Sequence, residues 1–121
     1  MNAIMNEYTA SDGDQFAYFF RKDGLGKLVG KRTWGGVRGM AYGPGLLDGG
    51  HITVPHDAVY GVDSQWIIEN SGVDADVVVD DAPGENADSQ LLVSVHTLLE
   101  QLRSRPIVPL AAPSLPAYPK R

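Results

Sequence analysis

A short apolar segment that runs into an amphipathic helix, with a serine at the junction, constrains the fold of this chain most. Residues 3–7 predict a strand and residues 12–23 a helix, whose first-turn Asp12 and Asp14 suit the helix dipole. Ser11 stands at the turn between them. A serine there presents its hydroxyl beside unpaired backbone N–H groups, which can stabilise an oxyanion. The pattern is typical of a nucleophile site, although serine is also a common helix N-cap.

The remaining chain predicts short strands, tight turns and one more helix. Residues 34–50 are dense in glycine, which is typical of hairpins. The first helix places its apolar residues on one face, and these are Phe16, Phe19 and Phe20. Further strands are predicted over residues 28–33, 51–55, 59–61, 66–69 and 77–79. The sequence therefore indicates an α/β fold with short mixed strands and two main helices.

The second predicted helix spans residues 88–103 and follows an acidic, turn-rich loop at residues 80–86. Its apolar residues recur at helical spacing, and these are Leu91, Leu92, Val95, Leu98, Leu99 and Leu102. We expect this leucine face to lie in a core or an interface, with self-association through it. Residues 1–105 are expected to form one domain, and residues 106–121 a proline-rich extended tail.

Composition excludes several classes of function. The chain has 121 residues, a net charge of −5 and scattered basic residues, which argues against a nucleic-acid partner. It has no cysteine, which removes disulfides, thiolate metal sites and a cysteine nucleophile, and fits a reducing compartment. No apolar run is long enough to span a membrane, and the start lacks the pattern of a signal peptide. We expect a soluble, cytoplasmic protein without a membrane partner.

Three motifs in order resemble the catalytic domain of tricorn-like peptidases, in the C-terminal-processing (tail-specific) serine peptidase family. They are Asn-Glu-Tyr-Thr-Ala-Ser-Asp-Gly-Asp at residues 6–14, Gly-Lys-Arg-Thr-Trp-Gly-Gly-Val at 30–37, and Ile-Glu-Asn-Ser-Gly-Val-Asp-Ala-Asp at 68–76. The resemblance implies part of a crotonase/Clp-protease-like core and hydrolysis of peptide bonds in oligopeptides. It also implies a peptide substrate, a homo-oligomer, and neither cofactor nor metal.

The same resemblance assigns three site residues. Ser11 matches the catalytic serine, and Asp12 matches the residue whose backbone N–H contributes to the oxyanion hole. Glu69 matches the acidic member of a catalytic tetrad, which orients the histidine through an intervening serine. In the family, that histidine and serine come from an earlier segment. We therefore expect the C-terminal part of a peptidase domain, which carries the nucleophile without its base and is inactive alone.

The three histidines of the chain do not match the catalytic one. His51 and His56 bracket a predicted strand and are followed by Asp57, but their spacing, with a proline between them, is not a known metal-ligand pattern. His96 falls on the polar side of the second helix, which predicts a surface position.

Other interpretations remain open at this level. Without the resemblance, Glu69 reads as a solvated carboxylate at a strand end, and Trp34 either walls a substrate cleft or packs in the core. The main alternative function is a non-catalytic structural or oligomerisation module, whose exposed strand edges would pair with another chain. A third is a crotonase-like acyl-CoA hydrolase or hydratase, for which no CoA site is visible.

Overall fold

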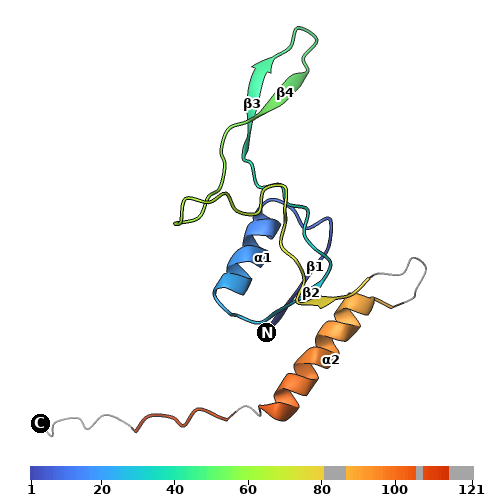
Figure 1. Cartoon of the computed structure of the whole chain (residues 1–121), viewed down its shortest axis with the longest axis vertical. Helices are drawn as coiled ribbons and strands as arrows, with labels where there is room; N and C mark the ends of the chain where they lie inside the picture. The colour runs from blue at the N-terminus through green and yellow to red at the C-terminus, as the bar shows by residue number, and fades with distance from the viewer. Residues whose placement is uncertain (81–86, 106–107, 115–121) are drawn as a thin grey trace, which may run out of the picture.

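A three-stranded parallel sheet organises the chain in the computed structural model, which describes residues 1–80, 87–105 and 108–114 (Figure 1). Its strands lie in the order β1-β2-β5. They are β1 (Asn2–Met5), β2 (Lys27–Gly30) and β5 (Val77–Val78). The other elements are helices α1 (Asp12–Lys22) and α2 (Ser89–Ser104), and strands β3 (Met40–Gly45) and β4 (His51–Pro55). The α/β class, the two helices and the short strands are confirmed.

Two glycines lie at the ends of α1 and β2, in backbone conformations that other residues rarely adopt. Gly24, just beyond α1, has a φ of 63°, the left-handed conformation that stops a helix. Gly30 has a φ of 124°, and a Cβ there would lie 2.0 Å from the carbonyl oxygen of Met5. The chain therefore leaves the sheet at Gly30, and the predicted extension of this strand to residue 33 is wrong.

The hydrophobic core lies between α1, the sheet and two returning loops. Its buried members are Met5, Ala17, Phe20, Leu28, Val37, Ile68 and Val73. Helix α1 turns Asp14, Ala17 and Phe20 inward, a stripe with a spacing of three residues. Phe16 and Phe19 fall outside this stripe and are 59% and 45% exposed. The rings of Phe16 and Phe20 lie 5.6 Å apart, as expected for side chains on one face, but only Phe20 of the three predicted phenylalanines is buried.

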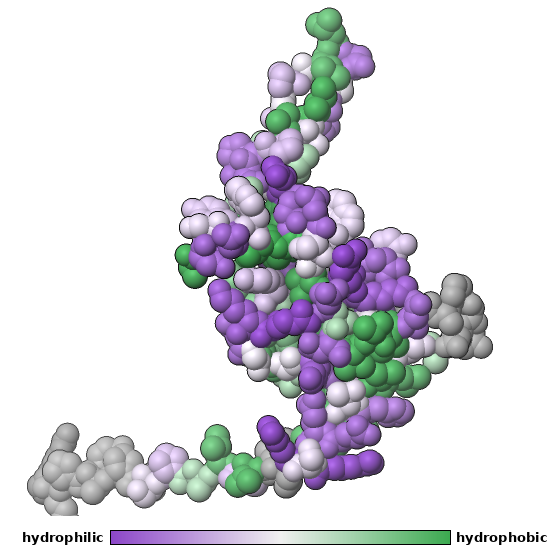
Figure 2. Space-filling model, viewed as in Figure 1, coloured by the Kyte–Doolittle hydropathy of each residue, from purple (hydrophilic) through white to green (hydrophobic). Residues whose placement is uncertain are grey.

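Helix α2 packs on the sheet through polar residues. Gln90 and Ser94 are buried, and Asn2 donates from Nδ2 to the Ser94 carbonyl at 3.1 Å. Of the predicted leucine face, only Leu98 is half-buried, and the other members are exposed. Figure 2 shows hydrophobic atoms gathered at the surface beside the start of α2. The core placement of this face is therefore wrong, and its use as an interface stays a prediction.

Strands β3 and β4 form an antiparallel hairpin that projects from the sheet (Figure 1), which confirms the hairpin predicted from the glycine-rich stretch. Every residue of β4 is exposed. The predicted strands at 59–61 and 66–69 are reduced to one bridge between Tyr60 and Trp66. The second ends early because Ile68 and Asn70 have φ values of 70° and 61°, which turn the chain back.

Two predicted segments reach outside the described residues. The acidic loop beyond Asp80 lies there, and so does most of the proline-rich tail. Residues 108–114 of the tail are exposed and form neither helix nor strand. The domain boundary at residue 105 stays a prediction. Neither helix in the described part of the chain is long and apolar enough to cross a membrane.

Asp76 ties α1 to the sheet and generates a pH-dependent prediction. It accepts a hydrogen bond from the Leu28 N–H at 2.8 Å and pairs with Arg21 at 3.0 Å, and these contacts lower the pKa of its carboxyl. A lowered pKa adds stability above the ordinary value of 3.8, and that stability is lost as the pH falls through the folded-state value. We expect Asp76→Asn to lower the unfolding free energy by about 1–2 kcal/mol at pH 7.

Urea unfolding of both proteins at pH 7 and at pH 3 measures this effect. The difference between them is expected to shrink at pH 3, because the stability that the lowered pKa of Asp76 provides is progressively lost as the pH falls below 3.8. An equal loss of unfolding free energy at both pH values would contradict a stabilising role of the ionised Asp76 carboxylate.

Candidate active site

Three segments from distant parts of the sequence meet beyond the carboxyl ends of β1 and β2. The N–H of Trp34 donates to the Thr9 carbonyl at 2.9 Å, and the N–H of Ser11 donates to the Gly36 carbonyl at 3.1 Å. The N–H of Asn70 donates to the Gly35 carbonyl at 2.8 Å. The carboxyl ends of parallel strands are where α/β proteins place their sites. The three segments bring the predicted residues Ser11, Asp12 and Glu69 into this region.

Ser11 occupies the turn from β1 into α1 in a strained conformation. Its φ of 56° and ψ of −115° mirror the first corner of a type II turn, a region that glycine favours. An ordinary N-cap residue instead has extended backbone angles. The residue is exposed and begins α1 as its N-cap. A strained strand-to-helix turn that exposes a serine is the geometry of the nucleophile elbow in α/β-hydrolases.

Asp12 is the first residue of α1 and is exposed. The neighbouring amides of Gly13 and Gln15 donate to the carbonyls of Ala10 and Ser11. In the part of the chain that the structure describes, no group accepts from the Asp12 N–H. This N–H therefore stays available next to the Ser11 hydroxyl, as an oxyanion donor requires.

Asp14 is fully buried, at 0% exposure, directly behind the serine turn. Its Oδ2 accepts from the N–H of Ser11 at 2.9 Å and of Gly36 at 3.3 Å, and its Oδ1 accepts from Gly35 at 2.9 Å. The first-turn position of Asp14 by itself predicts only a helix-dipole effect. The Ser-x-x-Asp spacing of a capping box was the available signal, because it predicts a bond back to the Ser11 N–H.

Glu69 is held by the protein rather than solvated. Its side chain is 20% exposed, its Oε2 accepts from the Val37 N–H at 2.9 Å, and its Oε1 lies 3.4 Å from Nε of Arg38. The residues on either side, Ile68 and Asn70, both have positive φ. Ile68 is buried and β-branched, so its conformation is a genuine outlier. The interpretation of Glu69 as a free surface carboxylate is wrong.

One peptide unit connects the serine turn to Glu69. The Gly36 carbonyl accepts from Ser11, and the N–H on the other side of the same peptide, that of Val37, donates to Glu69. Across this peptide the Ser11 nitrogen and the carboxylate oxygen lie roughly 8 Å apart. No hydrogen bond joins Ser11 directly to Glu69 in the described chain.

A cavity of about 240 Å³ opens beside Glu69. It is lined by Arg38, Ala58, Val59, Trp66, Glu69 and Asn70. The carboxylate is therefore reachable by a group that enters this cavity.

Comparison with known proteins decides the family. Residues 1–79 match peptidase family S41. The chain belongs to peptidase family S41. It is 45% identical over 105 residues to the tricorn protease of Thermoplasma acidophilum and 44% identical over 102 residues to a tricorn protease homolog of Saccharolobus solfataricus. These alignments cover 84% and 82% of this chain, but only 10% of each relative.

A crystal structure of tricorn protease superposes with a TM-score of 0.77 at 45% identity. The match covers 84% of this chain and 10% of that one. The chain thus spans about a tenth of the length of these relatives. The resemblance read from the three motifs is confirmed.

The histidines of this S41 chain do not reach its site. In the described residues, none of the three hydrogen-bonds to Ser11 or Glu69. His51 contacts the ring of Tyr42, with centroids 4.9 Å apart, and Nδ1 of His56 lies 2.9 Å from Oδ1 of the adjacent Asp57. His96 is exposed on α2, as predicted. The structure therefore offers Ser11 no imidazole base among the residues that it describes.

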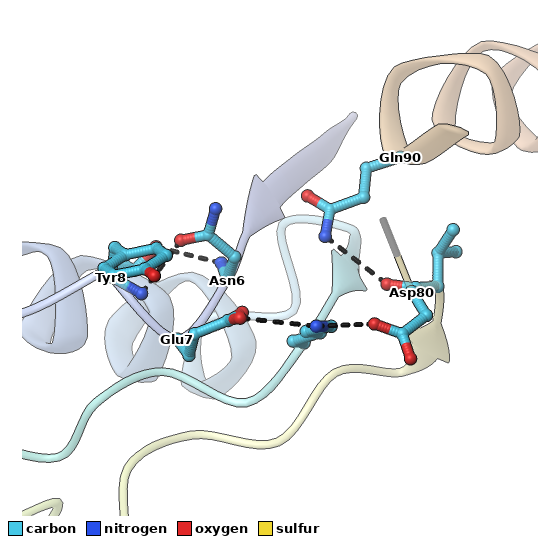
Figure 3. A network of polar contacts seen from close by, with 8 residues as sticks. Asn6, Glu7, Tyr8, Asp80 and Gln90 are labelled. Carbon is cyan, nitrogen blue, oxygen red and sulfur yellow. Dashed lines mark hydrogen bonds and ion pairs between the residues drawn. The ribbon is translucent and has the colours of Figure 1, made fainter. Parts of the chain in front are cut away.

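Lys31 is a basic residue just beyond the carboxyl end of β2, and it is not a substitute base. Its ammonium lies 2.5 Å from Asp80 and 3.3 Å from Glu7. Figure 3 shows Glu7 and Asp80 on opposite sides of this amino group. The hydrogen bonds to Asp80 and then Glu7 raise the pKa of Lys31, so the amine stays protonated at neutral pH.

Trp34 is 66% exposed, so the prediction that it packs in the core is wrong. Its ring lies against Gly36, where an added Cβ would come within 2.4 Å of it. Because Gly36 bonds to Ser11, this indole borders the serine turn.

The strain at Ser11 predicts an unusual response to substitution. Ser11→Gly is expected to raise the unfolding free energy by about 0.5–1 kcal/mol, because glycine adopts the positive φ without strain. Ser11→Ala keeps the strain, so we expect no such gain in stability from it. Urea unfolding of both variants measures the contrast. A loss of stability in both variants would mean that the serine is an ordinary cap.

Proposed function

We propose that this chain supplies the nucleophile and the acidic member of a serine peptidase site that hydrolyses peptide bonds in oligopeptides. The Ser11 hydroxyl attacks the scissile carbonyl, and the Asp12 N–H stabilises the oxyanion that forms. Glu69 orients a histidine, through an intervening serine, and that histidine takes the proton from Ser11. Both of these partners come from a segment outside the residues described here.

The observation that carries this proposal is the strained, exposed backbone of Ser11 next to the unpaired Asp12 N–H. Strain of this kind persists where the surroundings over-determine it, and it clusters at functional sites. Membership of peptidase family S41 supports hydrolysis of peptides as the chemistry. The cavity beside Glu69 supports a relay, because it leaves space for the missing groups.

Several finer statements belong to the same proposal. The chain alone is inactive, since a serine without a base retains little chemistry. The sheet and helices form part of a crotonase/Clp-protease-like core, and Trp34 walls the substrate cleft. The working protein is a cytoplasmic homo-oligomer that takes short peptides as substrates.

A fluorophosphonate probe, which reacts with activated serines, tests the nucleophile. Free imidazole is added as a diffusing substitute for the absent histidine. Ser64 is the matched internal control, since it also has a positive φ, at 62°, and is exposed, but no helix follows it. We expect Ser11 to be labelled at least about tenfold faster than Ser64, because one oxyanion donor changes rates by about 10²–10³ when fully positioned. Mass spectrometry of proteolytic peptides quantifies both sites.

Two results would count against this function. Equal labelling of Ser11 and Ser64 would remove the case for an activated serine. Rapid peptide hydrolysis by the purified 121-residue chain, abolished by Ser11→Ala, would instead contradict its inactivity and the need for an outside base.

The exposed leucine face of α2 favours a second function, a non-catalytic oligomerisation module. Five of its six predicted members are more than 40% exposed, although apolar groups of this size gain by leaving water. We expect the chain to self-associate through this face. Leu99→Glu is expected to yield a monomer, and His96→Glu, on the same helix, to leave association unchanged. Light scattering after size exclusion measures the mass, and a wild-type monomer at high concentration would contradict the module.

A further inference from the structure

We propose that Asp14 is the positioning residue of the nucleophile: its buried carboxylate holds Ser11 in its strained conformation and sets its placement relative to Glu69. This inference rests on the proposed function of Ser11. Asp14 is fully buried behind the turn, and its carboxylate accepts from the backbone N–H of Ser11. It therefore acts through the backbone of other residues.

The carboxylate of Asp14 binds amides from two separate segments. From its own helix it takes the Ser11 N–H, and from the loop after β2 it takes the amides of Gly35 and Gly36. In the described chain no lysine or arginine pairs with it. A charge removed from water needs hydrogen-bond donors when it has no counter-charge, and here the three amides supply them. Hydrogen bonds to an ionised acceptor are stronger than bonds between neutral groups. The negative charge thus draws the two segments together.

This arrangement over-determines the backbone at Ser11. Its N–H is shared between Oδ2 of Asp14 and the carbonyl of Gly36, which limits how the serine turn can relax. The turn can relax only in ways that keep this N–H within reach of both acceptors, which belong to α1 and to the loop after β2. The free energy of these bonds is what holds the serine in a region that non-glycine residues avoid.

The same carboxylate also sets the path to Glu69. It binds the N–H of Gly36, whose carbonyl accepts from Ser11, and the next amide along, that of Val37, donates to Glu69. The serine turn and Glu69 are therefore both hydrogen-bonded to the same short loop. A shift of that loop would move one relative to the other, and a misplacement of 1 Å can cost about 10²-fold in rate.

Asparagine distinguishes positioning from simple packing, since it has the shape of aspartate but can accept hydrogen bonds through only one of its two terminal groups. In Asp14→Asn, at least one of the amides of Ser11, Gly35 and Gly36 loses its acceptor. Asp76→Asn is the matched control, because Asp76 also accepts a buried-strand amide, that of Leu28, but lies away from the serine turn.

The experiment compares amide hydrogen exchange and Ser11 labelling, by fluorophosphonate with imidazole, in both variants of the full chain. For Asp14→Asn we expect exchange at one or more of the amides of Ser11, Gly35 and Gly36 to accelerate at least about tenfold, the effect of losing about 1.4 kcal/mol. Labelling of Ser11 is expected to slow by at least about tenfold. For Asp76→Asn we expect faster exchange at Leu28, with Ser11 labelled at the wild-type rate.

Unchanged exchange at these three amides, or Ser11 labelling at the wild-type rate in Asp14→Asn, would overturn the inference. If wild-type Ser11 is not labelled above Ser64, the proposed function fails, and the exchange data alone then decide whether Asp14 holds the turn. If Asp14→Asn does not fold, the double variant Ser11→Gly/Asp14→Asn is used. Recovery of folding supports the inference, because glycine needs no restraint there, and failure of both variants overturns it.

Discussion

A fully buried carboxylate is the constraint on which the site of this S41 chain depends. Asp14 brings a negative charge into the protein, and three backbone amides from two segments surround it. Because leaving any of them unbonded would be costly, the serine turn and the glycine loop after β2 must come together. The sheet and α1 place both segments at the same end of the parallel strands, so that one side chain can reach them.

Backbone strain and tight packing occur together around this region. Ser11 and Ile68 both have positive φ. Ser11 is itself a predicted site residue, and Ile68 directly precedes another, Glu69. Gly35 and Gly72 approach so closely that a Cβ on Gly35 would lie 2.5 Å from the Gly72 nitrogen. Close backbone contact between the two loops restricts how either could relax. A strained serine and a held carboxylate are therefore maintained by the same contacts.

The rest of the molecule has apolar surface that its own core does not use. The hairpin of β3 and β4 projects from the sheet, with Ile52 and Val54 more than 40% exposed. All the leucines of α2 except Leu98 are also exposed. Figure 2 shows hydrophobic atoms at the hairpin tip as well as beside α2. The hydrophobic core that the described residues form lies between α1, the sheet and the returning loops, and these exposed side chains are not part of it.

Local chemistry allowed much of this protein to be read from its sequence. The helix from Asp12 ends at a glycine with positive φ, the hairpin follows from glycine-rich turns, and the motifs around Ser11 and Glu69 identify the family. These signals lie within a few residues of one another, so the sequence contains them directly. Burial could not be read in this way, since the faces of Phe19 and of the α2 leucines depend on which neighbours are present.

Hydrophobic periodicity alone determined that two helices and several short strands would form, and residue identity determined that Ser11 could be a nucleophile. Only the tertiary structure decided that Asp14 binds two segments at once, that Trp34 borders the serine turn rather than the core, and that one peptide joins Ser11 to Glu69. The physical reason is that these contacts join residues more than 20 positions apart, where spacing along the chain gives no information on distance.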